Sequence, residues 1–458
     1  MVRTAHRTAH RTAHRTAHPT ALRTVPLALA GTLGLGVLIA PQTAQAQPGT
    51  ADPLPAIERA AHPLRSTGPG GSTKDLRPLG RMVGDASVVG LGEATHGSHE
   101  FFTMKDRVFR YLVEEKGFTT FSQEVSWTTG LRFDAYVRGG EGDVRELVHK
   151  ELAKTPWDTQ EYVELLTWMR AYNDKHPDRQ VRFMGNDLNY PEIGGELFDG
   201  VEDYVRAHEP DLLPRITELY APIRRLADGD TYMGRPLEER KKLAGKAREA
   251  RDLLNGLQPA SGSREFTIAL HHARSISQTA TIYAFPFDTP EGVKDGMLYR
   301  DRLMAENTAW WQRHTGEKVL LSAHNAHVGY ESYDPRYPKM QGAFLRDRLG
   351  ERYVSIGFTF DQGSFMAQSA ESEAWKPRSV GAATRGMNEY TLDKVRHDDY
   401  FLDMRTAPAA ARKWLGKGRL TQSIGTAFPD GPHKIRLAPS HDILIHLNRV
   451  TAAHRQSQ

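Results

Sequence analysis

The stretch that decides the fold is Ser87-Val88-Val89-Gly90-Leu91-Gly92-Glu93-Ala94-Thr95-His96-Gly97. It begins as a short apolar run, which is typical of a buried strand in a parallel sheet. A carboxylate, Glu93, and an imidazole, His96, follow directly and are three positions apart. That spacing places both side chains on one side of a turn or helix start. Such a carboxylate either forms a structural hydrogen bond or supports the imidazole as a general base.

Three further apolar runs repeat this arrangement, and each follows a helix-like stretch. These runs are Phe118–Phe121, Val181–Met184 and Lys318–Leu321. The polar residues after them are, in order, Glu124, then Asn186 and Asp187, then His324, Asn325 and His327. Because ligands bind beyond the carboxyl ends of parallel strands, we expect these side chains to meet in one cleft. The pattern predicts an α/β fold with a mainly parallel central sheet flanked by helices.

The chain divides into segments of different composition. Residues 47–80 are rich in Pro, Gly and Ser, which predicts a linker that leads into a catalytic domain over residues 81–458. Residues 194–280 are dense in Glu, Arg, Lys and Leu, which predicts a helical insertion over the cleft. After His327 we expect strands at Tyr353–Phe360 and Ile443–Leu447, with a loop-rich segment between them to about Lys434.

Residues 1–46 have the pattern of a secretion signal. Four Arg-Thr-Ala-His repeats at Arg3–His18 precede an apolar run, Val25–Ala40, and the cleavage pattern Ala44-Gln45-Ala46. The apolar run is shorter than the ~20 residues that a membrane-spanning helix needs. We therefore expect a secreted protein with no stable membrane anchor.

Composition narrows the classes of partner and chemistry. The chain has 60 basic and 56 acidic residues, but five arginines lie in the first 46 residues, which contain no acid, so the remainder is close to neutral. This balance argues against nucleic-acid binding. The chain contains no cysteine, so thiol nucleophiles and cysteine metal sites are excluded. No feature of the sequence indicates the oligomeric state.

Searches for common catalytic motifs leave only histidines and carboxylates. The sequence contains no G-x-S-x-G, Walker A or H-E-x-x-H motif. Taken alone, His324 and His327 would suit zinc ligation, oxyanion stabilisation or hydrogen bonding at the sheet edge. Burial should raise the pKa of Glu124 unless a cation lies near it, and Lys105 or Arg107 would serve.

At three places the sequence resembles the erythromycin esterase family. GEATHGSHEFFTMKDR, residues 92–107, resembles the opening motif of that family, and Glu124 and LSAHNAHVG, residues 321–329, match its other signature sites in order. The block Arg300–Asn307 resembles a further family segment. The resemblance covers about residues 80 to 450. It implies a hydrolase that opens a macrolide-type lactone with water, without a covalent intermediate, a required metal or another cofactor.

The resemblance also implies roles for particular residues. His96 would be the general base beside Glu93, and Glu124, His324 and His327 would complete the catalytic group. The family arginine expected in the first helix falls at Lys105, which keeps the charge but not the bidentate geometry. The predicted substrate-binding residues are Lys105, Arg107, Asp187, Asn325 and Arg300.

Two other classes of protein remain open alternatives. One is a metal or haem-iron binding protein on the same fold, because the histidines and glutamates offer nitrogen and oxygen ligands. The other is a non-catalytic module that closes over a small-molecule ligand.

Overall fold

The computed structural model describes residues 52–456, apart from 191, 227, 258–262 and 370. The predicted secretion signal, residues 1–46, lies outside the described part. Within the described part, no helix combines the length and the apolar character that a membrane crossing requires.

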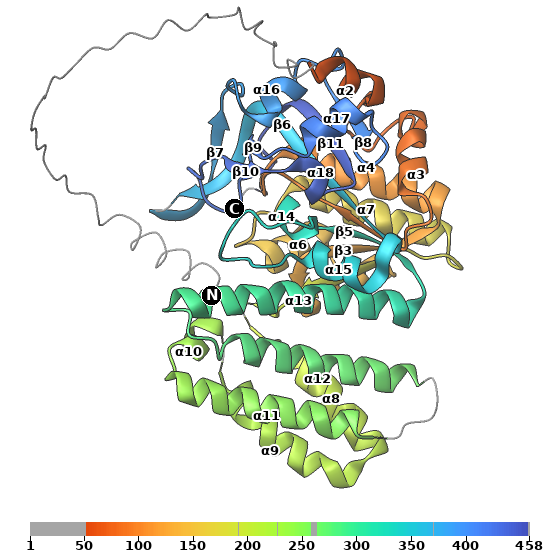
Figure 1. The fold of residues 1–458 in the computed structure, drawn as a ribbon. Coiled ribbons are helices and arrows are strands. Elements are labelled where there is room, and N and C mark those ends of the chain that lie inside the picture. The colour runs from red at the N-terminus through yellow and green to blue at the C-terminus, as the bar shows by residue number, and fades with distance from the viewer. Residues whose placement is uncertain (1–51, 191, 227, 258–262, 370, 457–458) are drawn as a thin grey trace, which may run out of the picture.

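A nine-stranded sheet forms the centre of the molecule (Figure 1). Its strands are β1 (His62–Pro63), β2 (Val88–Leu91), β3 (Phe118–Ser126), β4 (Arg182–Asp187), β5 (Lys318–Ser322), β6 (Tyr353–Ser369), β7 (Ser372–Val380), β8 (Tyr400–Asp403) and β11 (Ile443–Val450). They are ordered β1-β8-β11-β6-β2-β5-β3-β4, and β7 pairs with β6. All pairs from β11 to β4 are parallel, whereas β1, β7 and β8 pair antiparallel. The predicted mainly parallel sheet flanked by helices is confirmed.

The four strands that were expected to end in polar residues are neighbours in the sheet. They are β2, β5, β3 and β4, and each is parallel to the next. Leu91 pairs with Ser322, Ser322 with Gln123, and Gln123 with Gly185, so the four strands are in register where they end. The residues that follow them therefore leave the sheet side by side along one edge.

Helices cover both faces of the sheet. The α-helices are α2 (Leu54–Ala60), α3 (Arg77–Val83), α4 (His99–Lys116), α5 (Trp127–Val137), α6 (Val144–Leu152), α7 (Gln160–Lys175), α8 (Gly195–His208), α9 (Leu213–Arg224), α10 (Gly229–Met233), α11 (Leu237–Asn255), α12 (Arg264–Ile282), α13 (Pro290–Thr315), α14 (Asn325–Val328), α15 (Gln341–Leu349), α16 (Asn388–Leu392), α17 (Ala409–Leu415) and α18 (Leu437–Ser440). Short 3₁₀ helices are η1 (Lys74–Leu76), η2 (Pro210–Leu212) and η3 (Gly350–Arg352).

Alternation along the strands divides the core into two main layers. Val89 and Leu320 belong to a core with α3, α4 and α7, whereas their neighbours Val88 and Leu321 belong to a second core with α13 and α15. Successive strand residues point to opposite faces, so a strand covered on both faces must be apolar throughout. This is why these runs are continuous rather than alternating.

The linker prediction for residues 47–80 is wrong over its described part, residues 52–80. Strand β1 extends the sheet by pairing with β8, and Ile57, Leu76 and Leu79 are fully buried. The Gly- and Ser-rich residues are concentrated at 66–72, and apolar residues on either side pack into the core. The Pro, Gly and Ser content of the whole segment concealed the buried residues Leu76 and Leu79.

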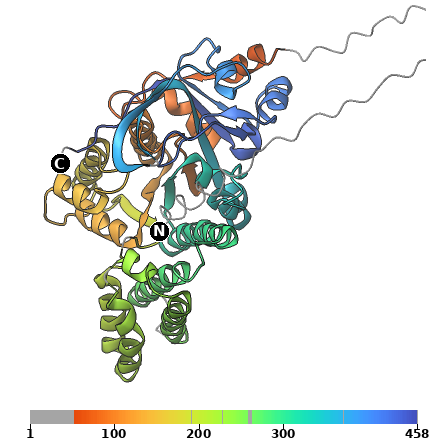
Figure 2. The ribbon, with the colours of Figure 1, turned by 90° about the vertical axis from the view of Figure 1, so that its left-hand side faces the viewer.

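Helices α8 to α12 follow β4 and extend away from the sheet, below α13 in Figure 1 and at the bottom of Figure 2. The end of this segment that includes α10 and the last turn of α12 borders the cleft described below. The segment to Lys434, for which we predicted mostly loops, also contains β7, α16, β8, α17 and the strands β9 (Arg419–Thr421) and β10 (His433–Ile435).

Candidate active site

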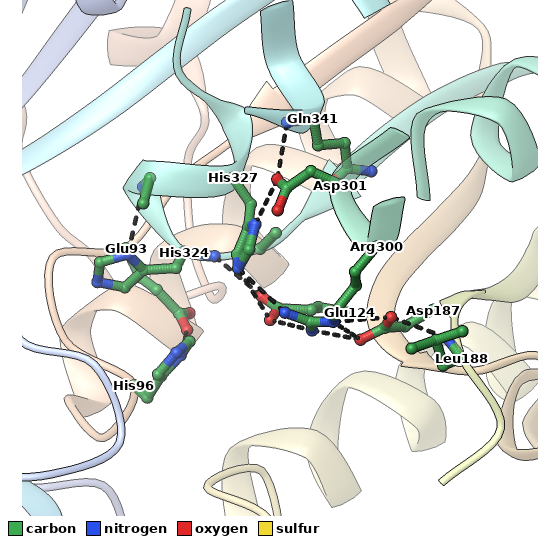
Figure 3. A network of polar contacts seen from close by, with 12 residues as sticks. Glu93, His96, Glu124, Asp187, Leu188, Arg300, Asp301, His324, His327 and Gln341 are labelled. Atoms are coloured by element: carbon green, nitrogen blue, oxygen red, sulfur yellow. Dashed lines mark hydrogen bonds and ion pairs between the residues drawn. The ribbon is translucent and has the colours of Figure 1, made fainter. Parts of the chain in front are cut away.

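The carboxyl ends of β2, β3, β4 and β5 border one cleft of about 1080 Å³. Six of the ten predicted site residues line it, namely His96, Glu124, Asp187, Arg300, His324 and His327. Figure 3 shows them gathered around a network of polar contacts. The sheet register explains why these side chains converge, because the four strands end next to one another at the same edge of the sheet.

The turn after β2 holds His96 against Glu93. His96 Nδ1 lies 2.6 Å from Glu93 Oε1, and Lys105 from α4 donates to Glu93 Oε2. Lys105 also donates to the carbonyl oxygen of Ala323 at 3.4 Å. Burial alone would raise the pKa of Glu93, but Lys105 and His96 outweigh burial and keep that pKa below its usual value. Glu93 is therefore ionised and occupies Nδ1 of His96, which leaves Nε2 for the cleft.

His324 is a neutral imidazole with a free donor. Its Nδ1 accepts a hydrogen bond from Ala326 N–H at 3.2 Å, which caps the start of α14. Burial, the largest cause, and the neighbouring His96 side chain lower the pKa of His324 to about 3. The single proton of the neutral ring is therefore on Nε2, a buried atom with no hydrogen-bond partner among the described residues. The His324 ring lies 4.9 Å from that of His96, centroid to centroid.

His327 is a cation held between two carboxylates. Its Nδ1 lies 2.8 Å from Asp301 Oδ1, and its Nε2 lies 3.5 Å from Glu124 Oε1. Burial alone would lower the pKa of His327, but Asp301 and Glu124 outweigh burial and raise that pKa to about 9. His327 therefore carries a proton on both ring nitrogens at neutral pH.

Arg300, from α13, is the arginine that neutralises Glu124. Its Nη2 lies 2.9 Å from Glu124 Oε1, and its Nε lies 3.0 Å from each carboxylate oxygen of Asp187 (Figure 3). Burial alone would raise the pKa of Glu124, but His327 and Arg300 outweigh burial and hold that pKa well below its usual value. Glu124 is ionised, and two cations share its charge.

The substrate contacts predicted for Lys105 and Arg107 are wrong, and so is the role we gave Arg107 in neutralising Glu124. The Lys105 side chain is buried and donates to Glu93 Oε2, and it does not line the cleft. Arg107 donates to Asp75 Oδ1 at 2.6 Å and to the carbonyl oxygen of Ser72 at 2.9 Å, outside the cleft. Residues two positions apart on a helix do not share a face, so these two cations serve different neighbours.

Asn325 does not contact the cleft either, so its predicted substrate role is wrong. Its side chain bonds both main-chain groups of Phe358, donating to the carbonyl oxygen at 2.7 Å and accepting from N–H at 2.9 Å. This contact ties α14 to β6. A Cβ atom at Gly92 would lie 2.1 Å from Asn325 Oδ1, which explains the glycine at the end of β2.

Sequence reasoning missed two contacts of the histidines that line the cleft. Asp301 is the direct partner of His327, although we singled out its segment only for family resemblance. Trp157, in the turn before α7, lines the cleft and contacts the His96 ring edge-on, with the two ring centroids 5.7 Å apart. An Asp beside an Arg is a common pair, and a tryptophan in a turn indicates packing, so neither pattern pointed to the site.

This fold and this cluster of ionised carboxylates, histidines and arginine define a class, that of α/β enzymes with a polar cleft at the carboxyl edge of a parallel sheet. The profile of the erythromycin esterase family matches residues 113–450. The chain belongs to the erythromycin esterase family, and so to hydrolases that act on esters or lactones. The resemblance that we identified from three sequence motifs is confirmed.

Individual relatives agree with this assignment. The erythromycin esterase type II of Escherichia coli is 25% identical over 323 residues, which cover 66% of this chain and 75% of that protein. A solved structure from Bacillus cereus is 32% identical with a TM-score of 0.81, and the match covers 89% and 99% of the two chains. An erythromycin esterase mutant in its open conformation has a TM-score of 0.66 at 16% identity, covering 86% and 98%, which shows a shared fold.

Proposed function

We propose that this protein hydrolyses its ester or lactone by general-base activation of water at His96, without a covalent intermediate. The observation that carries this proposal is the 2.6 Å contact between His96 Nδ1 and Glu93 Oε1, on a ring that lines the cleft. An ionised carboxylate on Nδ1 fixes the tautomer, orients the ring and stabilises the imidazolium that forms during the reaction. His96 Nε2 is then the atom that accepts the proton.

The reaction has two stages. In the first, a water molecule gives a proton to His96 Nε2 while its oxygen bonds to the carbonyl carbon, and the carbonyl electrons move onto oxygen. In the second, this tetrahedral oxyanion collapses and the bond from carbon to the alkoxy oxygen breaks. His96 returns the proton to that alkoxy oxygen, so the products are an acid and an alcohol. His96 both accepts and returns the proton, so neither proton transfer requires a metal.

Two groups opposite His96 suit the stabilisation of the oxyanion. His324 offers a buried Nε2–H whose hydrogen-bonding capacity is unused among the described residues. His327, which also lines the cleft, adds a positive charge, and its Nε2 lies 3.5 Å from Glu124 Oε1. A donor already in place needs no reorganisation when charge develops, and removal of such a donor typically costs about 10²–10³-fold in kcat.

For the substrate we propose a macrolide-type lactone as the first candidate. The cleft of about 1080 Å³ is slightly larger than the usual range for sites of drug-sized ligands, about 300–1,000 Å³, and so has room for a large ring. Aromatic side chains on several elements offer apolar surface to a large ring, among them Trp157, Tyr283, Tyr337 and Trp375. The Escherichia coli relative carries the name of a macrolide. We propose that Asp187 and Arg300, which line the cleft, form polar contacts with the substrate.

We also propose that the enzyme is secreted. The basic leader, its apolar run and the Ala44-Gln45-Ala46 pattern support export, and an exported enzyme would meet such antibiotics outside the cell. Detection of the processed protein in culture medium tests this proposal, and its retention inside the cell would contradict it.

The test of the reaction is acid release from a panel of macrolides, simple lactones and acylated sugars by wild type and His96→Ala. We expect kcat to fall about 10²–10⁴-fold in the variant, the usual contribution of a general base, while the melting temperature is retained. His149→Ala is the matched control, because His149 also pairs with a carboxylate, Asp158, at 3.0 Å but does not line the cleft. Unchanged turnover in His96→Ala would refute the assignment, and turnover lost on metal chelation would favour the metal-binding alternative.

A further inference from the structure

Three potential metal ligands from distant parts of the chain meet outside the cleft. They are His99 at the start of α4, Glu161 in the first turn of α7, and His454 after β11, and their ligand atoms lie within 4.8 Å of one another. Among the residues that the structure describes, no other set of three histidine or acidic side chains reaches this proximity. None of the three lines the catalytic cleft.

A single carboxylate oxygen holds the two imidazoles of this cluster together. His99 Nδ1 lies 2.6 Å and His454 Nδ1 2.9 Å from Glu161 Oε1. The Glu161 side chain is only 3% exposed, and its other oxygen, Oε2, is buried without a hydrogen-bond partner among the described residues. The side chains of His99 and His454 are 31% and 66% exposed. The cluster therefore combines an incompletely satisfied buried anion with two imidazole side chains that solvent can reach.

We propose that His99, Glu161 and His454 form a binding site for a divalent cation of the zinc class, with water as the remaining ligand. Two imidazole nitrogens and a carboxylate oxygen are ligands that Zn²⁺ accepts at about 2.0–2.2 Å, which places ligand atoms of a tetrahedral site about 3.3 Å apart. The two contacts to Glu161 would lengthen by about half an ångström to admit the ion. Each ring would bind the ion through a deprotonated Nδ1 and keep one proton on Nε2, so a doubly protonated ring would release one proton to solvent and a neutral ring would release none.

The backbone around the cluster already holds the ligands in place. His99 N–H donates to the carbonyl oxygen of Thr451 at 2.8 Å, and Gln160 N–H donates to that of His454 at 2.8 Å. These bonds fix the C-terminal segment against the starts of both α4 and α7. A site with its scaffold in place loses little conformational entropy on binding an ion.

An ion at this site would brace the segments that carry two residues of the cleft. His99 follows His96 by three residues, and Glu161 follows Trp157 by four. The rings of His96 and Trp157 contact each other edge-on at 5.7 Å. The site contains neither residue, so its existence does not depend on the proposed reaction. The cation stabilises the folded chain because it binds the native arrangement and not the separated ligands.

The experiment is a competition titration of the full chain with Zn²⁺ against a chromophoric chelator, with melting curves recorded with and without Zn²⁺. We expect wild type to bind one more equivalent of Zn²⁺ than His454→Ala, and Zn²⁺ to raise the melting temperature of wild type by several degrees but not that of the variant. The leader histidines His6, His10, His14 and His18 are present in every variant, so ions bound there cancel in the difference.

Two further variants complete the test. His454→Asp, which replaces one ligand with another, should recover part of the binding, whereas His208→Ala should behave as wild type because exposed His208 lies outside the cluster and pairs with one carboxylate, Glu265, at 3.3 Å. His454 is mostly exposed, so we expect His454→Ala to fold, and its zinc-free melting curve checks this. Equal Zn²⁺ stoichiometry and equal thermal shifts in wild type and His454→Ala would overturn the proposal.

Discussion

Two sides of the catalytic cleft hold histidines from the same short helix in opposite protonation states. His324, at the start of α14, faces His96, and no carboxylate among the described residues pairs with either of its ring nitrogens, so burial lowers its pKa to about 3. His327, one turn later, lies between Asp301 and Glu124, which outweigh burial and raise its pKa to about 9. The carboxylates come from α13 and β3, so the neighbouring elements set the protonation state, not α14 itself.

The difference shows how one residue type supplies distinct chemistry in one cleft. At neutral pH, His324 is a neutral donor and His327 is a cation, and His96 with its single carboxylate partner is the proposed base. Each environment rests on a small number of buried charges. Removing those charges, or the histidines themselves, should therefore change the two sides of the cleft in different ways.

The largest expected effect comes from Arg300→Met. This change leaves Glu124 and Asp187 without their shared guanidinium, and breaking a buried ion pair typically costs about 3–5 kcal/mol of unfolding free energy. It also removes a positive charge that lowers the pKa of His327. Urea unfolding at pH 7 gives the loss of stability, and NMR titration of His327 should show a higher pKa than in wild type.

Arg336→Met is the matched control for Arg300→Met. Arg336 also lines the cleft, but its guanidinium is one-third exposed and pairs with Asp334 in the same loop. The expected loss is within about 1 kcal/mol. Equal losses of unfolding free energy in the two variants would show that burial does not increase the contribution of the Arg300 ion pairs to stability.

The next effect is the pH dependence of stability through His327. Because its folded pKa of about 9 is above the usual histidine value of 6.5, its contribution is fully present below pH 6.5 and disappears as pH rises through 9. The shift corresponds to about 3 kcal/mol. Urea unfolding of wild type and His327→Gln between pH 6 and 9.5 should show the stability difference between them shrinking by that amount. A constant difference would show that His327 is not protonated in the folded protein.

The smallest effect is expected on the acid side, through His324. Its folded pKa of about 3 is below the usual histidine value of 6.5, so the unfolded chain binds the proton more tightly and stability falls as pH drops below 6.5. Between pH 6.5 and 5 this amounts to about 2 kcal/mol, and His324→Gln should not lose it. The two proteins are compared by urea unfolding at both pH values. A parallel loss in the variant would remove the contrast between the two sides of the cleft.

The sequence predicted the parts of the site that depend on local pattern. The runs that became β2, β3, β4 and β5 are mainly apolar because both faces of the sheet are covered, with Arg182 in β4 and Thr119 and Thr120 in β3 as exceptions, and polar residues follow each run. Glu93 and His96 are close in the chain, so their contact follows from a single turn. The prediction for Arg107 failed because its helix directs it towards Asp75, and the linker prediction failed because averaged composition concealed anchors such as Leu76 and Leu79.

The amino-acid sequence alone determined the parallel sheet, the edge where polar groups gather and the family, because strand burial and short motifs can be identified from neighbouring residues. Only the tertiary structure decided that Asp301 meets His327, that Arg300 rather than Arg107 neutralises Glu124, and that no carboxylate of the described residues pairs with a ring nitrogen of His324. The physical reason is that the energy between charges depends on their separation in space and on their burial, and both quantities exist only once the helices pack on the sheet.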